Sequence, residues 1–235
     1  MTDVAAATSP GVDVRPAAGA TRAVVLVLPG GKANSYEPAE PSQLSSRRMN
    51  PLARAVHRQG ARHGVAVWKV QYRVRGWNGH DRSPAVDAQW ALDEVRRQHG
   101  DVPVALLGHS MGGRAAVNVL GDPSVVGAAL LCPWLPHEPI EVAWQKRVLL
   151  AHGIVDRWTS PRETREWAAA ARPLAAALTY VRVRRSGHFM FRRSRLWTDL
   201  AVGSTLSWLG LDPSVGRAAA KALAEAAAGA PTLTV

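Results

Sequence analysis

Blocks of consecutive hydrophobic residues alternate along the chain with segments of helical spacing. Residues 23–28 (AVVLVL) form an unbroken, β-branched-rich block that stops at Pro-Gly-Gly, as expected for a strand buried on both faces. A second such block spans residues 65–70. Between them, residues 51–60 place apolar side chains at helical spacing, begin with a proline and end with a glycine. The order is therefore strand, helix, strand.

The same alternation continues toward the C-terminus. Residues 84–100 predict a helix, and residues 102–107 return to a strand. Further strands are expected at residues 127–132, 147–151 and 178–183, with helices at about residues 112–120 and 161–171. This order predicts a mostly parallel sheet flanked by helices. Right-handed crossovers then gather the loops after the strands at one edge, where a ligand site is expected.

The chain of 235 residues is predicted to form one domain with two terminal segments. Hydrophobic residues make up 47% of it and charged residues 20%, as in globular proteins. Residues 1–21 show no helical or strand periodicity and predict a flexible or loosely packed segment. Residues 22–210 are the expected domain, and the alanine-rich residues 211–235 are a terminal helix, an interface or a tail.

A formal net charge of +11 raises the question of nucleic acid as a partner. The arginines are scattered, however, and no zinc-ligand spacing, basic region with heptads or aromatic RNA-binding signature accompanies them. The charge therefore indicates an arginine-rich surface, and no nucleic-acid partner is expected. An anionic substrate stays open.

Membrane and export signals are absent from the sequence pattern. No apolar run approaches the roughly 20 residues that span a bilayer, and the N-terminus has no basic start followed by an apolar stretch. The single cysteine, Cys132, lies among apolar neighbours and predicts a buried, inert thiol. We therefore expect no membrane partner and a cytoplasmic location, whereas the oligomeric state stays open.

Ser110 is the first candidate for chemistry. It is the centre of Gly108-His109-Ser110-Met111-Gly112, between a predicted strand and a predicted helix, which is the context of a nucleophile elbow. Such a turn strains the serine backbone and needs small neighbours. It also brings the hydroxyl to a helix N-terminus, where the Met111 amide can face an oxyanion. An ordinary glycine-rich turn is the alternative, and the preceding strand favours the elbow.

His188 is the best of the eight histidines as the base for Ser110, because it follows a predicted strand and enters the same edge of the sheet. Asp156, which follows another strand, is the best carboxylate to orient His188, and a turn or capping role is its alternative. Glu138 and Glu141 are the fallback acids. The chain order of serine, aspartate and histidine agrees with that of strand-elbow hydrolases.

Two other histidines are given structural roles. His109 points elsewhere on the sharp turn, and His152 could help shape the loop that carries the acid.

The motifs together resemble the α/β-hydrolase family, and they are Leu28-Pro29-Gly30-Gly31, Gly108-His109-Ser110-Met111-Gly112-Gly113, His152-Gly153-Ile154-Val155-Asp156 and Ser186-Gly187-His188. The resemblance spans about residues 24–208. It implies an α/β-hydrolase fold in a small form similar to esterases and dienelactone hydrolases. The interval at residues 133–146 is too short for a cap domain.

The resemblance also implies a mechanism with no metal or cofactor, in which Ser110 attacks an acyl carbon, His188 shuttles the proton and Asp156 steadies the imidazolium. It places the second oxyanion amide after the first strand, at Gly31 or Lys32. Many relatives have His-Gly in that loop where this chain has Pro-Gly, so both amides stay candidates.

Five large side chains on the predicted rim loops are candidates for lining an apolar acyl pocket, although each is equally plausible in packing: Trp134, Trp158, Phe189, Met190 and Trp77. The expected function is hydrolysis of a small to medium carboxylic ester or thioester by a serine hydrolase. An acyltransferase or a cofactor-free perhydrolase on the same triad is one alternative. A catalytically silent binding protein is the other.

Overall fold

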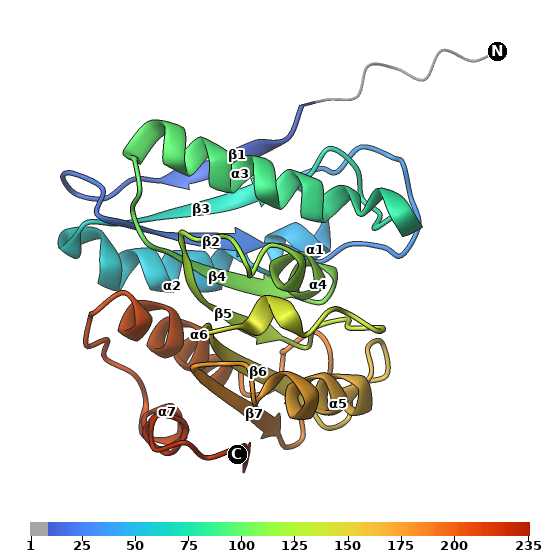
Figure 1. The fold of residues 1–235 in the computed structure, drawn as a ribbon, viewed down its shortest axis with the longest axis vertical. Coiled ribbons are helices and arrows are strands. Elements are labelled where there is room, and N and C mark those ends of the chain that lie inside the picture. The colour runs from blue at the N-terminus through green and yellow to red at the C-terminus, as the bar shows by residue number, and fades with distance from the viewer. Residues whose placement is uncertain (1–8) are drawn as a thin grey trace.

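Eight strands form one sheet in the computed structural model, which describes residues 9–235 (Figure 1). The strands are β1 (Gly11–Arg15), β2 (Ala23–Leu28), β3 (Val65–Gln71), β4 (Val104–His109), β5 (Val125–Leu131), β6 (Arg147–Gly153), β7 (Ala177–Val183) and β8 (Thr232–Thr234). Their order across the sheet is β1-β3-β2-β4-β5-β6-β7-β8. Only β1 is antiparallel to its neighbour. The mostly parallel sheet expected from the sequence is therefore confirmed.

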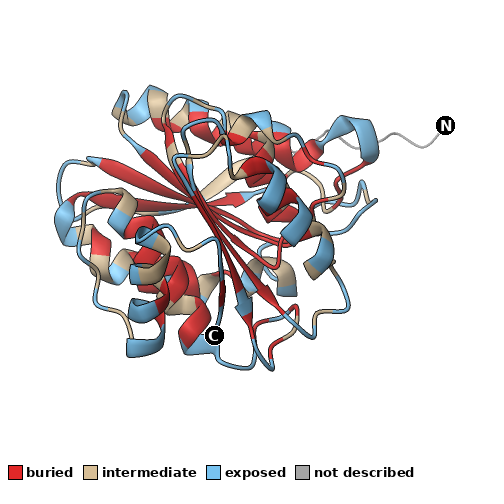
Figure 2. Cartoon of the chain, turned by 60° about the horizontal axis from the view of Figure 1, so that its bottom comes forward, coloured by how far each residue is buried: buried red, intermediate tan, exposed pale blue. Residues whose placement is uncertain are grey.

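Helices cover both faces of this sheet, and the strands lie buried between them (Figure 2). The α-helices are α1 (Leu44–Arg47), α2 (Asn50–Gly60), α3 (Ser83–His99), α4 (Met111–Asn118), α5 (Pro161–Ala171), α6 (Ser194–Trp208) and α7 (Arg217–Ala227), and short 3-10 helices span Ala61–His63, Gly79–Asp81 and Glu141–Ala143. One hydrophobic core lies under α3, α4 and α5, and the other under α2, α6 and α7. Alternate residues of β2 enter the two cores, which explains why its sequence is apolar throughout.

Both terminal segments contribute strands that the hydrophobic pattern did not predict. β1 pairs with β3 at one edge of the sheet, so the described part of residues 1–21 includes an edge strand, and residues 1–8 of that prediction lie outside the described residues. Residues 211–235 form the helix α7, and β8 then pairs with β7 at the opposite edge. Strands of five and three residues are too short for alternation to reveal them.

The helix α6 was also not predicted. Its sequence mixes apolar residues with threonine, serine and glycine, so it shows neither strong helix propensity nor one clear apolar face. It packs against β4 and β5 and between α2 and α7, and nine of its 15 residues are buried. Tertiary packing therefore stabilises this helix more than local preference does.

The connection from β5 to β6 holds only the short helix Glu141–Ala143, so no cap domain is inserted there, as the spacing predicted. Within residues 9–235, no helix combines the length and the apolar character needed to cross a bilayer.

Candidate active site

The loops after five neighbouring strands meet at one edge of the sheet. β2, β4, β5, β6 and β7 are adjacent and parallel, so their carboxyl ends point the same way. Ser110 directly follows β4, Asp156 follows β6 and His188 follows β7. The fold therefore brings together residues that lie up to 78 positions apart in the sequence.

Ser110 has the strained backbone expected of an elbow, with φ 55° and ψ −121°. Its amide donates to the carbonyl of Leu131 at 3.1 Å, and α4 begins at the next residue. Two glycines permit the turn: a Cβ on Gly112 would overlap the carbonyl oxygens of Leu28 and Pro29, and a Cβ on Gly108 would crowd Gly112. The glycines keep β4 and α4 close enough to hold the serine at the tip of the turn.

The Gly112→Ala variant tests this steric argument. Alanine favours helix over glycine by about 1 kcal/mol, but the atoms that its Cβ meets belong to the backbone and cannot rotate away. We expect the free energy of unfolding to fall by about 2 kcal/mol, or roughly 4 to 8 °C in Tm. Thermal and urea denaturation measure this.

Gly121→Ala is the matched control, because a Cβ there meets no atom within 4 Å. Its stability is expected to stay within about 0.5 kcal/mol of the parent. Equal stability of the two variants would contradict the steric account.

Ser110, His188 and Asp156 form a continuous hydrogen-bonded series. The Ser110 Oγ lies 3.0 Å from His188 Nε2, and His188 Nδ1 lies 2.9 Å from Asp156 Oδ2. Ser110 and His188 are buried, and the Asp156 side chain is inaccessible to solvent. In the tautomer that satisfies both contacts, Nδ1–H donates to the carboxylate and Nε2 accepts from the serine hydroxyl. His188 is therefore oriented to take the proton of Ser110.

The Asp156 carboxylate is held by several donors. Its Oδ1 accepts from the amides of Trp158 at 2.8 Å and Thr159 at 3.1 Å, and its Oδ2 also accepts from His152 Nε2 at 3.1 Å. Burial by itself raises the pKa of Asp156. The hydrogen bonds from His152, His188 and the Trp158 amide outweigh burial and hold that pKa well below its usual range. The group is therefore a fixed anion.

His152 supports the loop of the acid, as the sequence suggested. Its Nδ1 lies 2.9 Å from the Thr164 hydroxyl, so both ring nitrogens have partners. His152, Asp156 and Cys132 also place ligand atoms within 4.8 Å of one another. Burial raises the pKa of the Cys132 thiol, and the thiol form is a poor metal ligand. These contacts favour His152 as a hydrogen-bonding support for Asp156 over His152 as a metal ligand.

The fallback acids lie elsewhere. Glu138 forms an ion pair with Arg114 and accepts from Asn118 Nδ2 at 2.6 Å. Glu141 is exposed at the start of a short helix. Of the three candidates, only Asp156 contacts His188.

His109 ties the elbow to the loop of His188, because its Nε2 lies 3.0 Å from the His188 carbonyl oxygen. Burial lowers the pKa of His109 to about 3, so the ring is neutral and Nε2–H donates this bond. The structural role given to His109 agrees with this geometry.

The structure distinguishes between the candidate oxyanion amides. The Lys32 amide donates to the Arg75 carbonyl at 2.8 Å and is therefore occupied. Within residues 9–235, the amides of Gly31 and Met111 donate to no protein acceptor. A Cβ on Gly31 would overlap the Met111 side chain, so the two residues are in close contact. Gly31 and Met111 are the pair available to an oxyanion.

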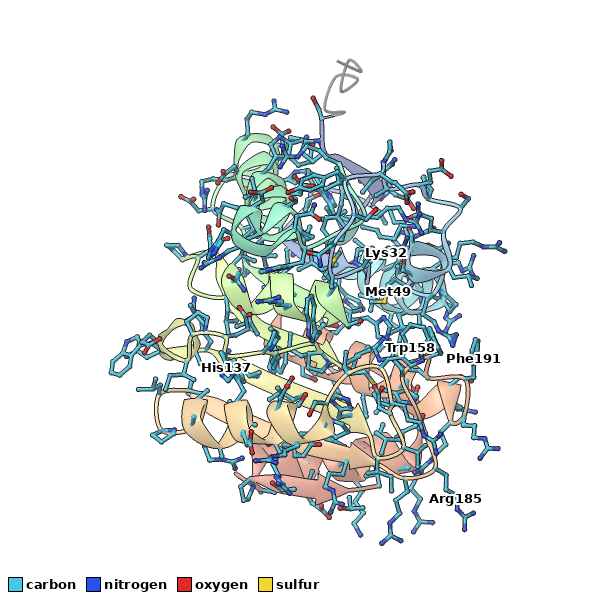
Figure 3. All side chains as sticks on the ribbon, turned by 90° about the vertical axis from the view of Figure 1, so that its right-hand side faces the viewer. Lys32, Met49, His137, Trp158, Arg185 and Phe191 are labelled. Carbon is cyan, nitrogen blue, oxygen red and sulfur yellow. The ribbon has the colours of Figure 1, made fainter. Side chains whose placement is uncertain are left out.

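A cavity of about 800 Å³ opens above Ser110 and His188. Three of the five predicted pocket residues line it: Trp134, Trp158 and Phe189. The Trp158 ring stacks near the His188 ring at 6.2 Å between centroids and meets the Phe189 ring edge-on at 5.3 Å. Figure 3 labels Lys32, Trp158 and Phe191, all cavity-lining residues on one side of the molecule.

The other two pocket predictions, Trp77 and Met190, are not supported by the structure. Trp77 is buried, and its ring packs under the Arg114 guanidinium at 4.0 Å. Met190 is buried in the core that lies under α6. Their loops do reach the rim, but both side chains turn inward to the apolar interior, which stabilises them there.

The sequence model of the alpha/beta hydrolase family matches residues 17–234. The chain belongs to the alpha/beta hydrolase family. This membership and the fold described above confirm the resemblance that the motifs indicated.

Solved structures of alpha/beta hydrolases share this fold at low sequence identity. A serine hydrolase without a lid from Xanthomonas campestris is 16% identical, with a TM-score of 0.63 over 87% of this chain and 91% of that one. The esterase Est2 of Thermogutta terrifontis, bound to propionate, is 16% identical, with a TM-score of 0.64 over 87% of this chain and 92% of the esterase. An alpha-beta serine hydrolase homologue from Coxiella burnetii is 15% identical, with a TM-score of 0.61 over 83% of this chain and 91% of that one.

Among curated proteins, erythronolide synthase EryA2 of Saccharopolyspora erythraea is 33% identical over 128 residues, which covers 49% of this chain. The chain spans only 3% of the length of that synthase.

Several residues at the cavity of this alpha/beta hydrolase were not found from the sequence. Leu44, Arg47 and Arg48 come from α1 and the residue after it, and Phe191 comes from the loop after His188. The connection between β2 and α2 has no hydrophobic periodicity, so nothing in the pattern showed that it folds back over the site. The one signal in the sequence was the bulky side chains after His188. The pocket prediction made for Phe189 and Met190 could have been extended to Phe191.

Proposed function

We propose that this alpha/beta hydrolase is a serine hydrolase that cleaves a small to medium carboxylic ester or thioester through an acyl-enzyme. The observation that carries this proposal is the series from Ser110 through His188 to Asp156 on a strained elbow. Two free amides beside the serine, those of Gly31 and Met111, add to it. Acyl transfer needs these parts together: a nucleophile, a base with an orienting acid, and oxyanion donors.

The chemistry follows in two steps. Ser110 Oγ attacks the acyl carbon while its proton passes to His188 Nε2, and the amides of Gly31 and Met111 hold the oxyanion. The carbon–oxygen or carbon–sulfur bond then breaks, and the leaving group takes the proton from His188. Water attacks the acyl-enzyme and gives its proton to His188, which returns it to Ser110 as the acid product leaves. Asp156 stabilises the imidazolium throughout.

The cavity supports a substrate of moderate size. It holds about 800 Å³, within the range of sites for small molecules, and aromatic side chains cover much of its wall. Two solved relatives are esterases, Est2 of Thermogutta terrifontis and Est1E of Butyrivibrio proteoclasticus, whose structures contain propionate and ferulic acid. These names favour ester cleavage. A cytoplasmic location and the lack of nucleic-acid or membrane partners stay predictions from the sequence.

A graded substrate panel tests the proposal. The full chain is assayed with para-nitrophenyl esters and acyl thioesters from acetyl to dodecanoyl, and turnover should peak at short to medium acyl lengths. A fluorophosphonate should label Ser110, since that serine is activated by His188. If neither turnover nor labelling is observed, a silent binding protein is the better description.

Acceptor competition separates hydrolysis from acyl transfer. With water, an alcohol and peroxide present together, the acid should be the main product. Preferential formation of a new ester or a peracid would instead favour an acyltransferase or a perhydrolase.

A further inference from the structure

Three cationic side chains line the cavity above Ser110. Lys32 comes from the loop after β2, and Arg47 and Arg48 come from the end of α1. Among the described residues, no aspartate or glutamate lines this cavity. Lys32 has a partner outside the cavity lining, because its Nζ lies 3.8 Å from Glu37 Oε2. The cavity wall therefore carries an excess of positive charge.

Neither arginine has a counter-ion among the residues that the structure describes. None of the ion pairs within residues 9–235 includes Arg47 or Arg48. The Arg48 guanidinium stacks on the Phe191 ring at 3.8 Å, and its Nη2 is buried without a hydrogen-bond acceptor in the same part of the chain. Stacking fixes the plane of the guanidinium and leaves its edge to bond.

A comparison with other partly buried arginines shows that the environment of Arg48 is unusual. Burial lowers the pKa of Arg48, Arg114 and Arg172. Arg114 is compensated by Glu138, and Arg172 donates to the Pro231 carbonyl at 2.7 Å. Within residues 9–235, Arg48 is the one of these three with a buried guanidinium nitrogen, Nη2, that has no hydrogen-bond acceptor. A desolvated donor without a partner is unfavourable, so its partner is expected to arrive with the ligand.

Arg48 also lies within electrostatic reach of the elbow. Burial is the main cause of the lowered pKa of His109, the residue before Ser110, and the positive charge of Arg48 lowers it further. Both Arg48 and Ser110 line the same cavity. A substrate with its acyl carbon at Ser110 can therefore place a second group at Arg48.

We propose that the cavity contains an anion subsite centred on Arg48, and that the substrate is an ester or thioester carrying a free carboxylate. This inference rests on the proposed function and narrows its substrate class. The guanidinium edge matches a carboxylate, which can accept two parallel N–H bonds. Arg47 and Lys32 add positive charge at the same mouth, and Phe189 and Phe191 cover the apolar part of the chain between the ester and the carboxylate.

Matched substrate pairs test the proposal with the full chain. On the acyl side, mono-para-nitrophenyl adipate is compared with para-nitrophenyl hexanoate. On the alcohol side, para-butyryloxybenzoate is compared with its methyl ester. For one of the two pairs, kcat/KM is expected to be at least about tenfold higher for the anion, mainly through KM. Which pair shows the preference identifies the side that carries the carboxylate.

Variants connect this preference to Arg48. Arg48→Met keeps an apolar stem over Phe191 and should reduce the anion-to-neutral ratio to about one, and Arg48→Lys should retain part of the ratio. Arg48→Gln serves in case Arg48→Met folds poorly. Arg97→Gln is the control, because Arg97 lies near the end of α3, where the chain turns back toward the start of β4 and away from Ser110. It should leave the ratio unchanged.

The outcomes separate this inference from the proposed function. Turnover of neutral esters with no preference for either anion, or a preference that Arg48→Met retains, would overturn the anion subsite and leave the hydrolase intact. If no ester is turned over, the anion subsite is tested by binding measurements. Ser110→Ala protein is titrated by NMR with both kinds of pair: monomethyl adipate against methyl hexanoate, and para-butyryloxybenzoate against its methyl ester. Tighter binding of either anion that disappears in the double variant with Arg48→Met supports the subsite, and equal binding within both pairs overturns it.

Discussion

Replacing Ser110 by alanine is expected to reduce kcat for a chromogenic short-chain ester by about 10⁴-fold or more. The variant removes the nucleophilic Oγ, which lies 3.0 Å from His188 Nε2, so no acyl-enzyme can form. The oxyanion amides of Gly31 and Met111 are on the backbone and stay in place. The residual rate therefore measures what these amides and the cavity contribute without a nucleophile. Stopped assays with purified protein measure it.

The control separates chemistry from folding. Ser207→Ala changes an exposed serine of α6 and should keep the full rate. Ser110→Ala should unfold at a Tm close to that of the parent, because alanine fills nearly the same space at the same strained φ. Retention of more than about a tenth of the rate would exclude Ser110 as the nucleophile.

The elements around the site could be predicted because their sequences carry local patterns. β2 and β4 are continuous apolar blocks, and their buried alternate residues supply both cores. Ser110 could be identified because the turn that carries it requires glycines, and these glycines are visible in the sequence. Asp156 and His188 were found because each follows a strand of a parallel sheet, so topology alone brings their loops to the edge of Ser110.

The remaining features depend on contacts that no local pattern records. α6 is a helix because other elements surround it, and β1 exists because β3 offers a free edge. Trp77 and Met190 lie in rim loops, yet the direction of each side chain is set by the space beneath it. Arg48 was not found from the sequence for a related reason. What singles it out is a missing hydrogen-bond acceptor among the described residues, and only the folded structure shows this.

The second large effect is expected for Asp156→Asn, with kcat falling by about 10³-fold to 10⁴-fold. The asparagine oxygen can keep the bonds from the Trp158 and Thr159 amides, which leaves its NH₂ group facing His152 and His188. His188 then accepts at Nδ1 and carries its proton on Nε2, so it cannot take the proton of Ser110. The binding of substrate should change little, and steady-state kinetics should show the loss in kcat.

The free energy of unfolding gives an independent measure of how the Asp156 carboxylate is held in the folded state. The pKa of Asp156 is lower in the folded state than in the unfolded chain, where it is about 3.9. Its ionised form therefore stabilises the fold above that pH, and this contribution is lost as the pH falls further. Asp156→Asn removes the contribution at every pH. The gap in free energy of unfolding between the parent and the variant should be largest near neutral pH and should narrow below about pH 4.

Glu141→Gln is the control for the acid assignment, because Glu141 is exposed and makes no contact with His188. It should keep kcat within about twofold of the parent, within the range of surface changes. A parent-like rate in Asp156→Asn together with a large loss in Glu138→Gln would transfer the orienting role to Glu138. That result would require Glu138 to leave Arg114 and Asn118, whose hydrogen bonds already occupy both of its carboxylate oxygens. The geometry therefore favours Asp156, since its carboxylate is already ionised, desolvated and in contact with His188 before any substrate binds.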